Sequence, residues 1–239
     1  MKIVEVKNIS KKISKATILN DLSLDIDEGE IVGLIGPSGA GKTTFVKSII
    51  GMEKIDKGSI KVFGKDIPNI DILQEIGYMA QSDALYEDLT AKENLEFFGQ
   101  IFKLNKSQIK ERINYTSKLV NIENSLSKKV KNYSGGMKRR LSLAISLIQD
   151  PKLLILDEPT VGIDPKLRFD IWNELHSLKN TGKSIIVTTH VMDEAVKCDR
   201  LALIRDGKII ATGTPSQLTK DFEVNTIEDI FLKLGSDVK

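Results

Sequence analysis

The sequence predicts an α/β fold, a mostly parallel sheet flanked by helices, and three observations predict it. Apolar runs without polar alternation, typical of strands buried on both faces, lie at 31–35, 153–156 and 184–188. Helical patterns separate these strands, at 42–50, 134–148 and 165–178. The 239 residues, 41% of them hydrophobic, are enough to bury a sizeable core. The net charge of +2 is far below that of the strongly basic proteins that bind nucleic acid, so no nucleic-acid partner is expected.

The first 30 residues show a different pattern, because polar and apolar residues alternate at 3–6 and 22–26. Such alternation predicts a small antiparallel sheet ahead of the main one. The start has no apolar stretch typical of a signal peptide, and no run approaches the length of a membrane span. The single cysteine, Cys198, suits a reducing compartment. We therefore expect a cytosolic chain, and any action at a membrane would need a partner that supplies the spans.

The segment of about 70 residues between Ala80 and Lys152 has only helical patterns. Thr90 and Glu93 fit a capping box at the start of its first helix. Near the end of the chain, apolar residues from Ile227 onward repeat at helical spacing before Gly235. We therefore predict three parts, which are a core with the antiparallel sheet at 1–81 and 149–220, an inserted helical sub-domain at 82–148, and a C-terminal helix and tail at 221–239.

A glycine-rich segment between the first buried strand and the next helix fits the pattern G-x-x-x-x-G-K-[ST]. Its residues are Gly36, Pro37, Ser38, Gly39, Ala40, Gly41, Lys42 and Thr43. Glycines let the backbone curl so that its N–H groups face phosphate oxygens, at a helix N-terminus that favours anions. Lys42 would bridge the β- and γ-phosphates, and Thr43 would place its hydroxyl on Mg²⁺. A plain glycine-rich turn is the alternative.

Two adjacent acids, Asp157 and Glu158, follow the second buried strand. Taken alone, acids in this place most often mark a solvated strand exit. Together with the phosphate loop, they predict that Asp157 holds Mg²⁺ through water and that Glu158 polarises the water attacking the γ-phosphate. His190 follows the third buried strand, so its position at a carboxyl strand end predicts a sensor of the γ-phosphate rather than a purely structural histidine.

A second anion site is predicted where Ser134, Gly135 and Gly136 open a helix that has no acid in its first turn. Capping alone needs only Ser134, so the two glycines indicate close approach of the backbone to another group. Because one loop already holds the γ-phosphate, this site is expected to act on the nucleotide of another copy.

These segments resemble the nucleotide-binding subunit of an ABC transporter, in the order and spacing of that family from Val6 to Leu234. The resemblance implies a P-loop NTPase core and ATP with Mg²⁺ as cofactors. It makes 36–43 the Walker A segment, which is followed by Thr44 as a further nucleotide-binding residue. It makes 153–158 the Walker B segment and 133–137 the signature. Segments such as Leu89–Leu95 are similar to the branch that exports drugs, sodium or lipid-like cargo.

The resemblance adds four residues to the predicted site. Gln81 becomes a Q-loop residue that senses Mg²⁺ and the γ-phosphate, and Asp164 belongs to a D-loop at the nucleotide. The family stacks an aromatic ring on adenine where Ile13 stands, and it often has glutamine where Met137 stands. Ile13 offers only apolar contact, while Met137 removes one side-chain hydrogen bond to the nucleotide.

The resemblance implies an ATPase subunit that dimerises head-to-tail around two ATP molecules and powers a separate membrane-spanning permease, most often as an exporter. It places the chain peripherally on the cytoplasmic face of the cell membrane, and it leaves open whether the two ATP-binding subunits are identical. Two alternatives remain at this point, a soluble mechanical ATPase unconnected with transport and a nucleotide-binding regulator that does not hydrolyse.

Overall fold

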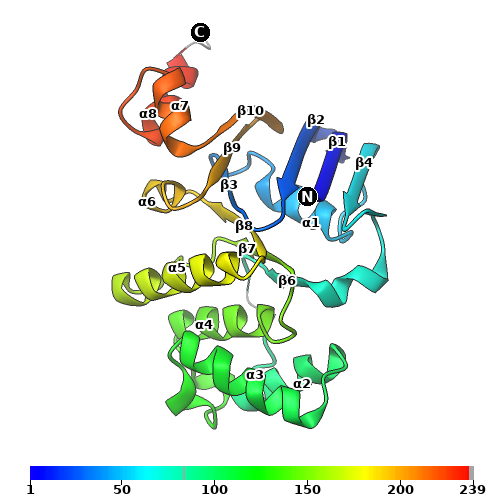
Figure 1. Cartoon of the computed structure of the whole chain (residues 1–239), viewed down its shortest axis with the longest axis vertical. Helices are drawn as coiled ribbons and strands as arrows, with labels where there is room; N and C mark the ends of the chain where they lie inside the picture. The colour runs from blue at the N-terminus through cyan, green and yellow to red at the C-terminus, as the bar shows by residue number, and fades with distance from the viewer. Residues whose placement is uncertain (83, 237–239) are drawn as a thin grey trace. The chain divides into compact units, whose positions relative to one another are not determined.

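The computed structural model describes residues 1–82 and 84–236, and these divide into two compact units. The first unit joins residues 1–70 to the chain from Ile186 onward, and the second runs from Asp71 to Ile185. Figure 1 colours the chain from blue to red and labels its helices and strands. Each unit is built from different elements.

The first unit begins with a four-stranded antiparallel sheet of order β2-β1-β4-β5, which confirms the predicted N-terminal sheet. Its strands are β1 (Lys2–Ile13), β2 (Ala16–Asp27), β4 (Lys57–Val62) and β5 (Lys65–Asp66). Val6, Leu24 and Ile26 alternate with exposed or half-buried neighbours and are themselves buried. The period-2 pattern therefore does place one face of these strands in a core.

The remaining strands of this unit follow the order β10-β9-β3-β8. They are β3 (Ile31–Ile35), β8 (Ser184–Thr189, which begins in the second unit), β9 (Arg200–Arg205) and β10 (Lys208–Gly213). β3 runs parallel to β9, and every residue of β3 and β8 is buried. Continuous apolar runs thus form strands covered on both faces, as predicted.

Helices complete the first unit, namely α1 (Lys42–Ile49), α6 (Met192–Ala195), α7 (Pro215–Asp221) and α8 (Ile227–Ser236). α8 packs against α6 and α7 and buries Ile227 and Ile230. The predicted last helix is therefore present, but it does not stop before Gly235, which is part of α8. A glycine costs about 1 kcal/mol in a helix interior and much less in a last turn, so it need not end the helix.

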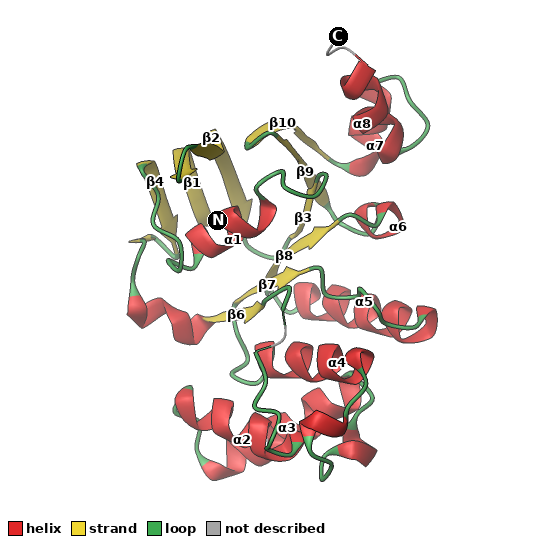
Figure 2. Ribbon diagram, turned by 180° about the vertical axis from the view of Figure 1, so that it is seen from behind, coloured by secondary structure: helices red, strands yellow, loops and turns green. Residues whose placement is uncertain are grey.

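The second unit contains two strands and four longer helices in its described part. The strands are β6 (Ile76–Met79) and β7 (Leu153–Asp157), and the helices are α2 (Ala91–Ile101), α3 (Lys106–Leu119), α4 (Gly135–Ser146) and α5 (Pro165–Asn180). Figure 2 shows that the chain between β6 and β7 is helical, with loops and short turns between its helices. Thr90 and Glu93 form the predicted capping box of α2.

The helices of this segment pack on one another and also on the strands and α5 of the same unit. α2, α3 and α4 contact each other, while α4 also contacts β6 and α3 also contacts α5. These contacts explain why the compact unit is wider than the predicted helical sub-domain at 82–148, which lies entirely inside it. Over residues 1–82 and 84–236, no helix is both long and apolar enough to cross a membrane.

Candidate functional site

The predicted phosphate loop lies in the first unit, between the end of β3 and the start of α1. Gly36 lies so close to β9 that a Cβ there would come within 2.2 Å of the carbonyl oxygen of Ile204. Gly41 has φ +103°, and a Cβ there would lie 2.8 Å from the carbonyl oxygen of Ile18. Both positions exclude side chains, so the loop can take this tight path only with glycine.

Lys42 folds its side chain back across this loop. Its Nζ donates hydrogen bonds to the carbonyl oxygens of Gly36, at 2.7 Å, and Pro37, at 3.0 Å, and the residue is 7% exposed. α1 has Gly41 as its N-cap, with no side-chain cap from the described residues and no acid in its first turn. A helix N-terminus without a carboxylate, beside a lysine, favours an anion, so the residues present fit a phosphate group.

His190 and Ile13, the other predicted site residues of this unit, are both exposed. His190 directly follows β8, which neighbours β3 in the strand order. Ile13 ends β1 next to the turn into β2, whereas the phosphate loop packs on β2 near Ile18. His190 therefore stands at a strand end as predicted, and the adenine contact at Ile13 stays a prediction.

In the second unit the structure brings Gln81 and Glu158 together. β6 and β7 run parallel, with Met79 opposite Leu156, so the residues that follow both strands emerge at the same edge. Gln81 Nε2 donates to Glu158 Oε2 across 3.3 Å. Asp157, the last residue of β7, is 1% exposed, and Glu158 is half-buried. A carboxylate that could act as a base thus lies beside an amide that could orient a ligand.

The predicted signature residues open α4. Ser134 is the N-cap, and its Oγ accepts a hydrogen bond from the N–H of Met137 at 3.3 Å. Ser134 and Gly135 are exposed, and a Cβ on Gly135 would meet no atom of the described chain within 4 Å. The packing inside this chain therefore does not require glycine at position 135.

The D-loop residue Asp164 caps α5, because its carboxylate accepts a hydrogen bond from the N–H of Leu167 at 3.0 Å. Pro165 follows in the first turn of the helix, where proline is favoured because its missing N–H would have no partner there. Gly162, two residues earlier, lies near the signature, since a Cβ on Gly136 would come within 3.1 Å of its carbonyl oxygen. The signature and the D-loop therefore approach each other within the second unit.

Arg139 is a residue that the sequence analysis did not single out. It is 7% exposed and donates hydrogen bonds to the carbonyl oxygens of Ala80, Gln81, Asp157 and Glu158. A signal was available, because Arg139 shares the buried stripe of α4 with Leu143 and Ser146 at positions i, i+4 and i+7. A charged residue in such a stripe indicates a specific set of partners.

Tyr78, on β6, adds a second buried polar group to this region. Its hydroxyl is buried and has no hydrogen-bond partner among the described residues. Burial, together with the negative charge of Asp157, raises the pKa of Tyr78 to about 12. The phenol therefore stays neutral at physiological pH.

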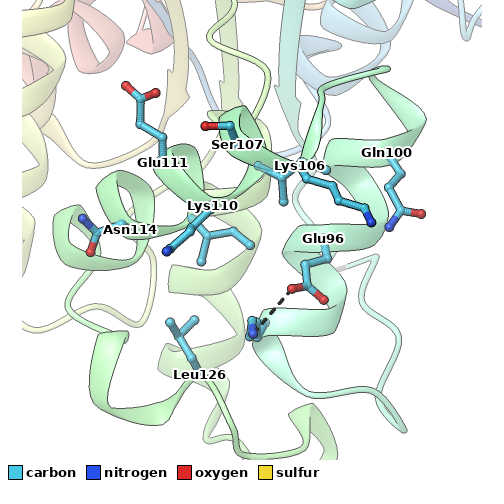
Figure 3. A pocket seen from close by; sticks show the side chains of 11 residues that line it. Glu96, Gln100, Lys106, Ser107, Lys110, Glu111, Asn114 and Leu126 are labelled. Atoms are coloured by element: carbon cyan, nitrogen blue, oxygen red, sulfur yellow. Dashed lines mark ion pairs between the residues drawn. The ribbon is translucent and has the colours of Figure 1, made fainter.

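A cavity of about 790 Å³ lies between α2 and α3, away from the predicted site residues. Three lysines, Lys92, Lys106 and Lys110, line it together with Glu96, which forms an ion pair with Lys92 at 3.6 Å (Figure 3). Residues 1–82 and 84–236 contain no group of three His, Cys, Asp or Glu side chains that could hold a metal ion.

Comparison with known proteins gives one consistent family. The family model described as ABC transporter matches residues 19–161. The chain is 42% identical to ABC transporter G family member 20 of Dictyostelium discoideum over 97% of its own length, although it spans only 32% of that protein. It is 40% identical to the Nod factor export ATP-binding protein I of Burkholderia lata, covering 90% of this chain and 72% of that one.

Solved structures agree with this comparison. The ATP-binding subunit of an ABC transporter superposes with a TM-score of 0.90 at 27% identity, covering 98% of this chain and 99% of that chain. A dimeric ATP-binding cassette in a post-hydrolysis state, bound to ADP and Pi, gives a TM-score of 0.81 at 28% identity over 88% of this chain and 98% of that chain. The predicted P-loop NTPase fold is therefore confirmed.

Proposed function

The chain belongs to the ABC transporter family, and we propose that it is an ATP-binding and hydrolysing subunit that dimerises around two ATP molecules and powers a separate membrane-spanning permease. The observation that carries this proposal is the pairing of Gln81 with Glu158 at the ends of β6 and β7, in a chain that also has a phosphate loop. The similarity to export proteins supports the exporter branch over the two alternatives without transport. The proposed location is the cytoplasmic face of the membrane.

The residues of the phosphate loop and of the ends of β6 and β7 carry the reaction in this proposal. Lys42 holds the β- and γ-phosphates, and the backbone N–H groups at 36–44 bind their oxygens. Thr43, Gln81 and Asp157 would hold Mg²⁺, which when bound neutralises the charge that develops on the phosphate oxygens. Glu158 accepts a proton from the water whose oxygen attacks the γ-phosphorus as the bond to the β-phosphate oxygen breaks.

The other predicted residues contact the nucleotide without taking part in the proton transfer. His190 senses the γ-phosphate, and Ile13 offers apolar contact to the base. Ser134, Gly135, Gly136 and Met137 of one copy bind the nucleotide held by the other copy, and Asp164 lies in the D-loop beside them. The exposure of Ser134 and Gly135 supports this arrangement, because it leaves the start of α4 accessible to a second copy.

Replacing the proposed base tests the reaction directly. Glu158→Gln should still bind ATP but lose about 10²- to 10⁴-fold in turnover, because the base is removed while the phosphate loop stays intact. The mutant should accumulate as an ATP-bound dimer in size-exclusion chromatography. Glu123→Gln, at an exposed position, is the matched control and should keep normal turnover. Near-normal phosphate release by Glu158→Gln would contradict the proposal.

We also propose where the permease docks. Tyr86 and Phe97 are exposed and form an aromatic cluster with Phe98, with the rings of Tyr86 and Phe97 at a centroid distance of 4.8 Å. Tyr86 of this cluster lies five residues after Gln81, so a partner bound there would be linked to the nucleotide through a short segment. Exposed aromatic residues are frequent anchors of protein interfaces.

Tyr86→Asp should abolish co-purification with the permease and leave the ATPase activity of the isolated subunit unchanged. Lys106→Glu, in the cavity between α2 and α3, is the control on a different surface of the same helices and should keep the partner. If Tyr86→Asp keeps the partner and Lys106→Glu loses it, the dock is the cavity instead.

A further inference from the structure

Arg139 lies in an environment that is costly for a positive charge. It occupies the second turn of α4 and is 7% exposed, on the same buried stripe as Leu143. It is the fifth residue of α4 and lies far from the last turn, where the helix dipole would favour a cation. The stability of α4 itself therefore does not explain why an arginine is buried here, and the explanation must lie in what it contacts.

The guanidinium group contacts two chain segments that belong to the proposed catalytic site. Nη1 donates to the carbonyl oxygens of Ala80, at 2.6 Å, and Gln81, at 3.0 Å. Nη2 donates to the carbonyl oxygen of Glu158, at 2.6 Å, and to that of Asp157. A planar guanidinium presents its donors at fixed angles, so these bonds set the spacing between the segments after β6 and β7.

These two segments need such a link because the pairing between β6 and β7 no longer joins them to each other. The ladder between β6 and β7 ends at Met79 opposite Leu156, and the contacted carbonyls come after this pair. Glu158 also has φ +54°, in the left-handed region that is unfavourable for a non-glycine residue. The 3.3 Å contact between the side chains of Gln81 and Glu158 is too long to fix this geometry alone.

We propose that Arg139 is a positioning residue for hydrolysis, which holds the backbone of Glu158 next to Gln81 and ties both to the helix that begins with the signature. This inference rests on the proposed function, in which Glu158 is the base. α4 begins at Gly135, about one turn before Arg139, so a displacement of the signature reaches the carbonyl of Glu158 through one helix and one side chain.

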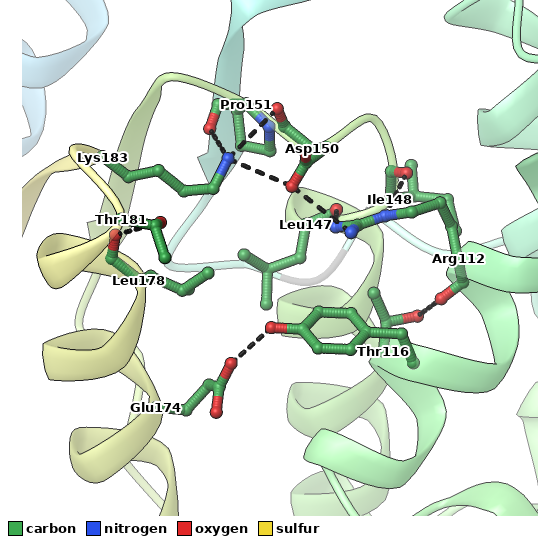
Figure 4. Close-up of polar contacts among 11 residues, drawn as sticks. Arg112, Thr116, Leu147, Ile148, Asp150, Pro151, Glu174, Leu178, Thr181 and Lys183 are labelled. Atoms are coloured by element: carbon green, nitrogen blue, oxygen red, sulfur yellow. Dashed lines mark hydrogen bonds and ion pairs between the residues drawn. The ribbon is translucent and has the colours of Figure 1, made fainter.

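Arg112 is the matched control for this role, because it makes the same kind of contact at the opposite end of α4. Its Nη2 donates to the carbonyl oxygen of Leu147 at 2.6 Å, and its Nε donates to that of Ile148 at 3.2 Å (Figure 4). Neither acceptor is a predicted site residue. Substitutions at Arg139 and Arg112 therefore remove hydrogen bonds of the same kind, four at Arg139 and two at Arg112, but only those of Arg139 reach the proposed base.

The test compares Arg139→Lys and Arg139→Gln with Arg112→Lys in the full chain. We expect both Arg139 variants to lose about 10- to 100-fold in kcat, while KM for ATP changes by less than about threefold, because the phosphate loop is untouched. Arg112→Lys should unfold at lower urea concentration but keep kcat within about twofold. The two substitutions at Arg139 provide a second measurement should one of them prevent folding.

A double mutant separates positioning from general stabilisation. In a Glu158→Gln background, Arg139→Lys should cause little further loss in single-turnover hydrolysis, because its effect acts through the missing carboxylate. The positioning role would be overturned if the double mutant lost activity by the product of the two single-mutant losses. Unchanged kcat in a folded Arg139→Lys would overturn it as well. Near-normal hydrolysis by Glu158→Gln alone would instead overturn the proposed function, so the two failures are distinguishable.

Discussion

At each end of α4 an arginine donates hydrogen bonds to main-chain carbonyls, but the two arginines have different roles. At the C-terminal end, Arg112 donates to the carbonyls of Leu147 and Ile148, and Asp150 forms ion pairs with Arg112, at 3.3 Å, and Lys183, at 3.0 Å (Figure 4). At the N-terminal end, Arg139 donates to carbonyls of the segments that follow β6 and β7. Both are arginines bound to main-chain oxygens, but the oxygens differ in kind.

The kind of carbonyl that each arginine contacts indicates which of the two contacts stabilises the fold. The last carbonyls of any helix lack partners within the helix, and a cation there also interacts favourably with the helix dipole. Arg112 therefore completes α4 and joins it to α3. Arg139 lies away from this end and binds carbonyls outside its own helix, so it serves the segments it contacts. We expect changes near the start of α4 to alter activity and changes near its end to alter stability.

The largest expected effect comes from breaking the signature and the phosphate loop in separate copies. Lys42→Ala and Ser134→Arg should each lower turnover by about 10²-fold or more, because every complete site needs Lys42 of one copy and Ser134 of the other. A heterodimer of the two has one doubly damaged site and one intact site. Mixing should thus restore activity to about a quarter of normal if copies exchange freely and intact sites act alone.

The control for this experiment is each variant by itself at the same total concentration, together with circular dichroism to show that it is folded. Full activity of Lys42→Ala and Ser134→Arg alone would contradict the shared site. It would also contradict the view that the start of α4 exists for activity.

Gly135→Ala sharpens the comparison, because it separates activity from packing at one position. A Cβ at Gly135 meets nothing in the described chain, so urea denaturation should show unchanged stability or a gain of up to about 1 kcal/mol. Turnover should nevertheless fall at least about tenfold, since a backbone that approaches a ligand cannot accept a methyl group.

Gly99→Ala, in α2, is the opposite case. A Cβ there would lie 2.8 Å from Cγ1 of Ile109, so stability should fall by about 1–3 kcal/mol while kcat stays normal in the folded fraction. Unchanged turnover in Gly135→Ala would remove the argument that its glycine faces a nucleotide.

Much of the fold was predictable because the signals are local. The buried runs at 31–35 and 184–189 are β3 and β8, and the capping box at Thr90 begins α2. A second capping box, formed by Asn105 and Gln108 at the start of α3, was missed although its residue types and spacing were visible in the sequence. Boundaries between compact units were less accessible, since they depend on contacts between distant segments such as β6 and β7.

The same distinction holds for the candidate site. The phosphate loop could be found because its chemistry lies in eight consecutive residues. The parallel-sheet argument placed Asp157 and Glu158 at a strand end, but the contact of Glu158 with Gln81 spans 77 positions. The partners of Arg139 lie 18 to 59 positions away and are main-chain oxygens, which every residue has, so no residue pattern could identify them.

Asp150→Asn tests the C-terminal end of α4. The substitution removes the ion pairs with Arg112 and Lys183 but keeps a side chain that tolerates the φ of +59° at this position. Because Asp150 is more than half exposed, the free energy of unfolding should fall by only about 0.5–1 kcal/mol. This loss should shrink in 1 M salt. A kcat that falls more than about twofold would show that this end of α4 also acts in catalysis.

Two tyrosine hydroxyls, those of Tyr115 and Tyr78, give small effects and a pH test. The hydroxyl of Tyr115, on α3, donates a hydrogen bond to Glu174, so Tyr115→Phe should cost about 1 kcal/mol at pH 7. The hydroxyl of Tyr78 has no partner among the described residues, so Tyr78→Phe should be neutral or slightly stabilising. Urea denaturation at pH 7 measures both, and a clear destabilisation by Tyr78→Phe would mean that its hydroxyl has a role in the native state.

Raising the pH gives Tyr78 a distinct signature. In the unfolded chain a tyrosine ionises near its ordinary pKa of 10.0, whereas burial and the charge of Asp157 raise the pKa of Tyr78 in the folded chain to about 12. The unfolded state therefore releases its proton first, so this contribution to stability is complete below pH 10 and is lost as the pH rises from 10 to 12. Burial and Glu174 raise the pKa of Tyr115 as well, so its loss lies in the same direction. Tyr78→Phe should make the decline in stability above pH 10 shallower, because phenylalanine has no proton to lose. An unchanged slope would place the Tyr78 hydroxyl in contact with water, against its burial beside Asp157.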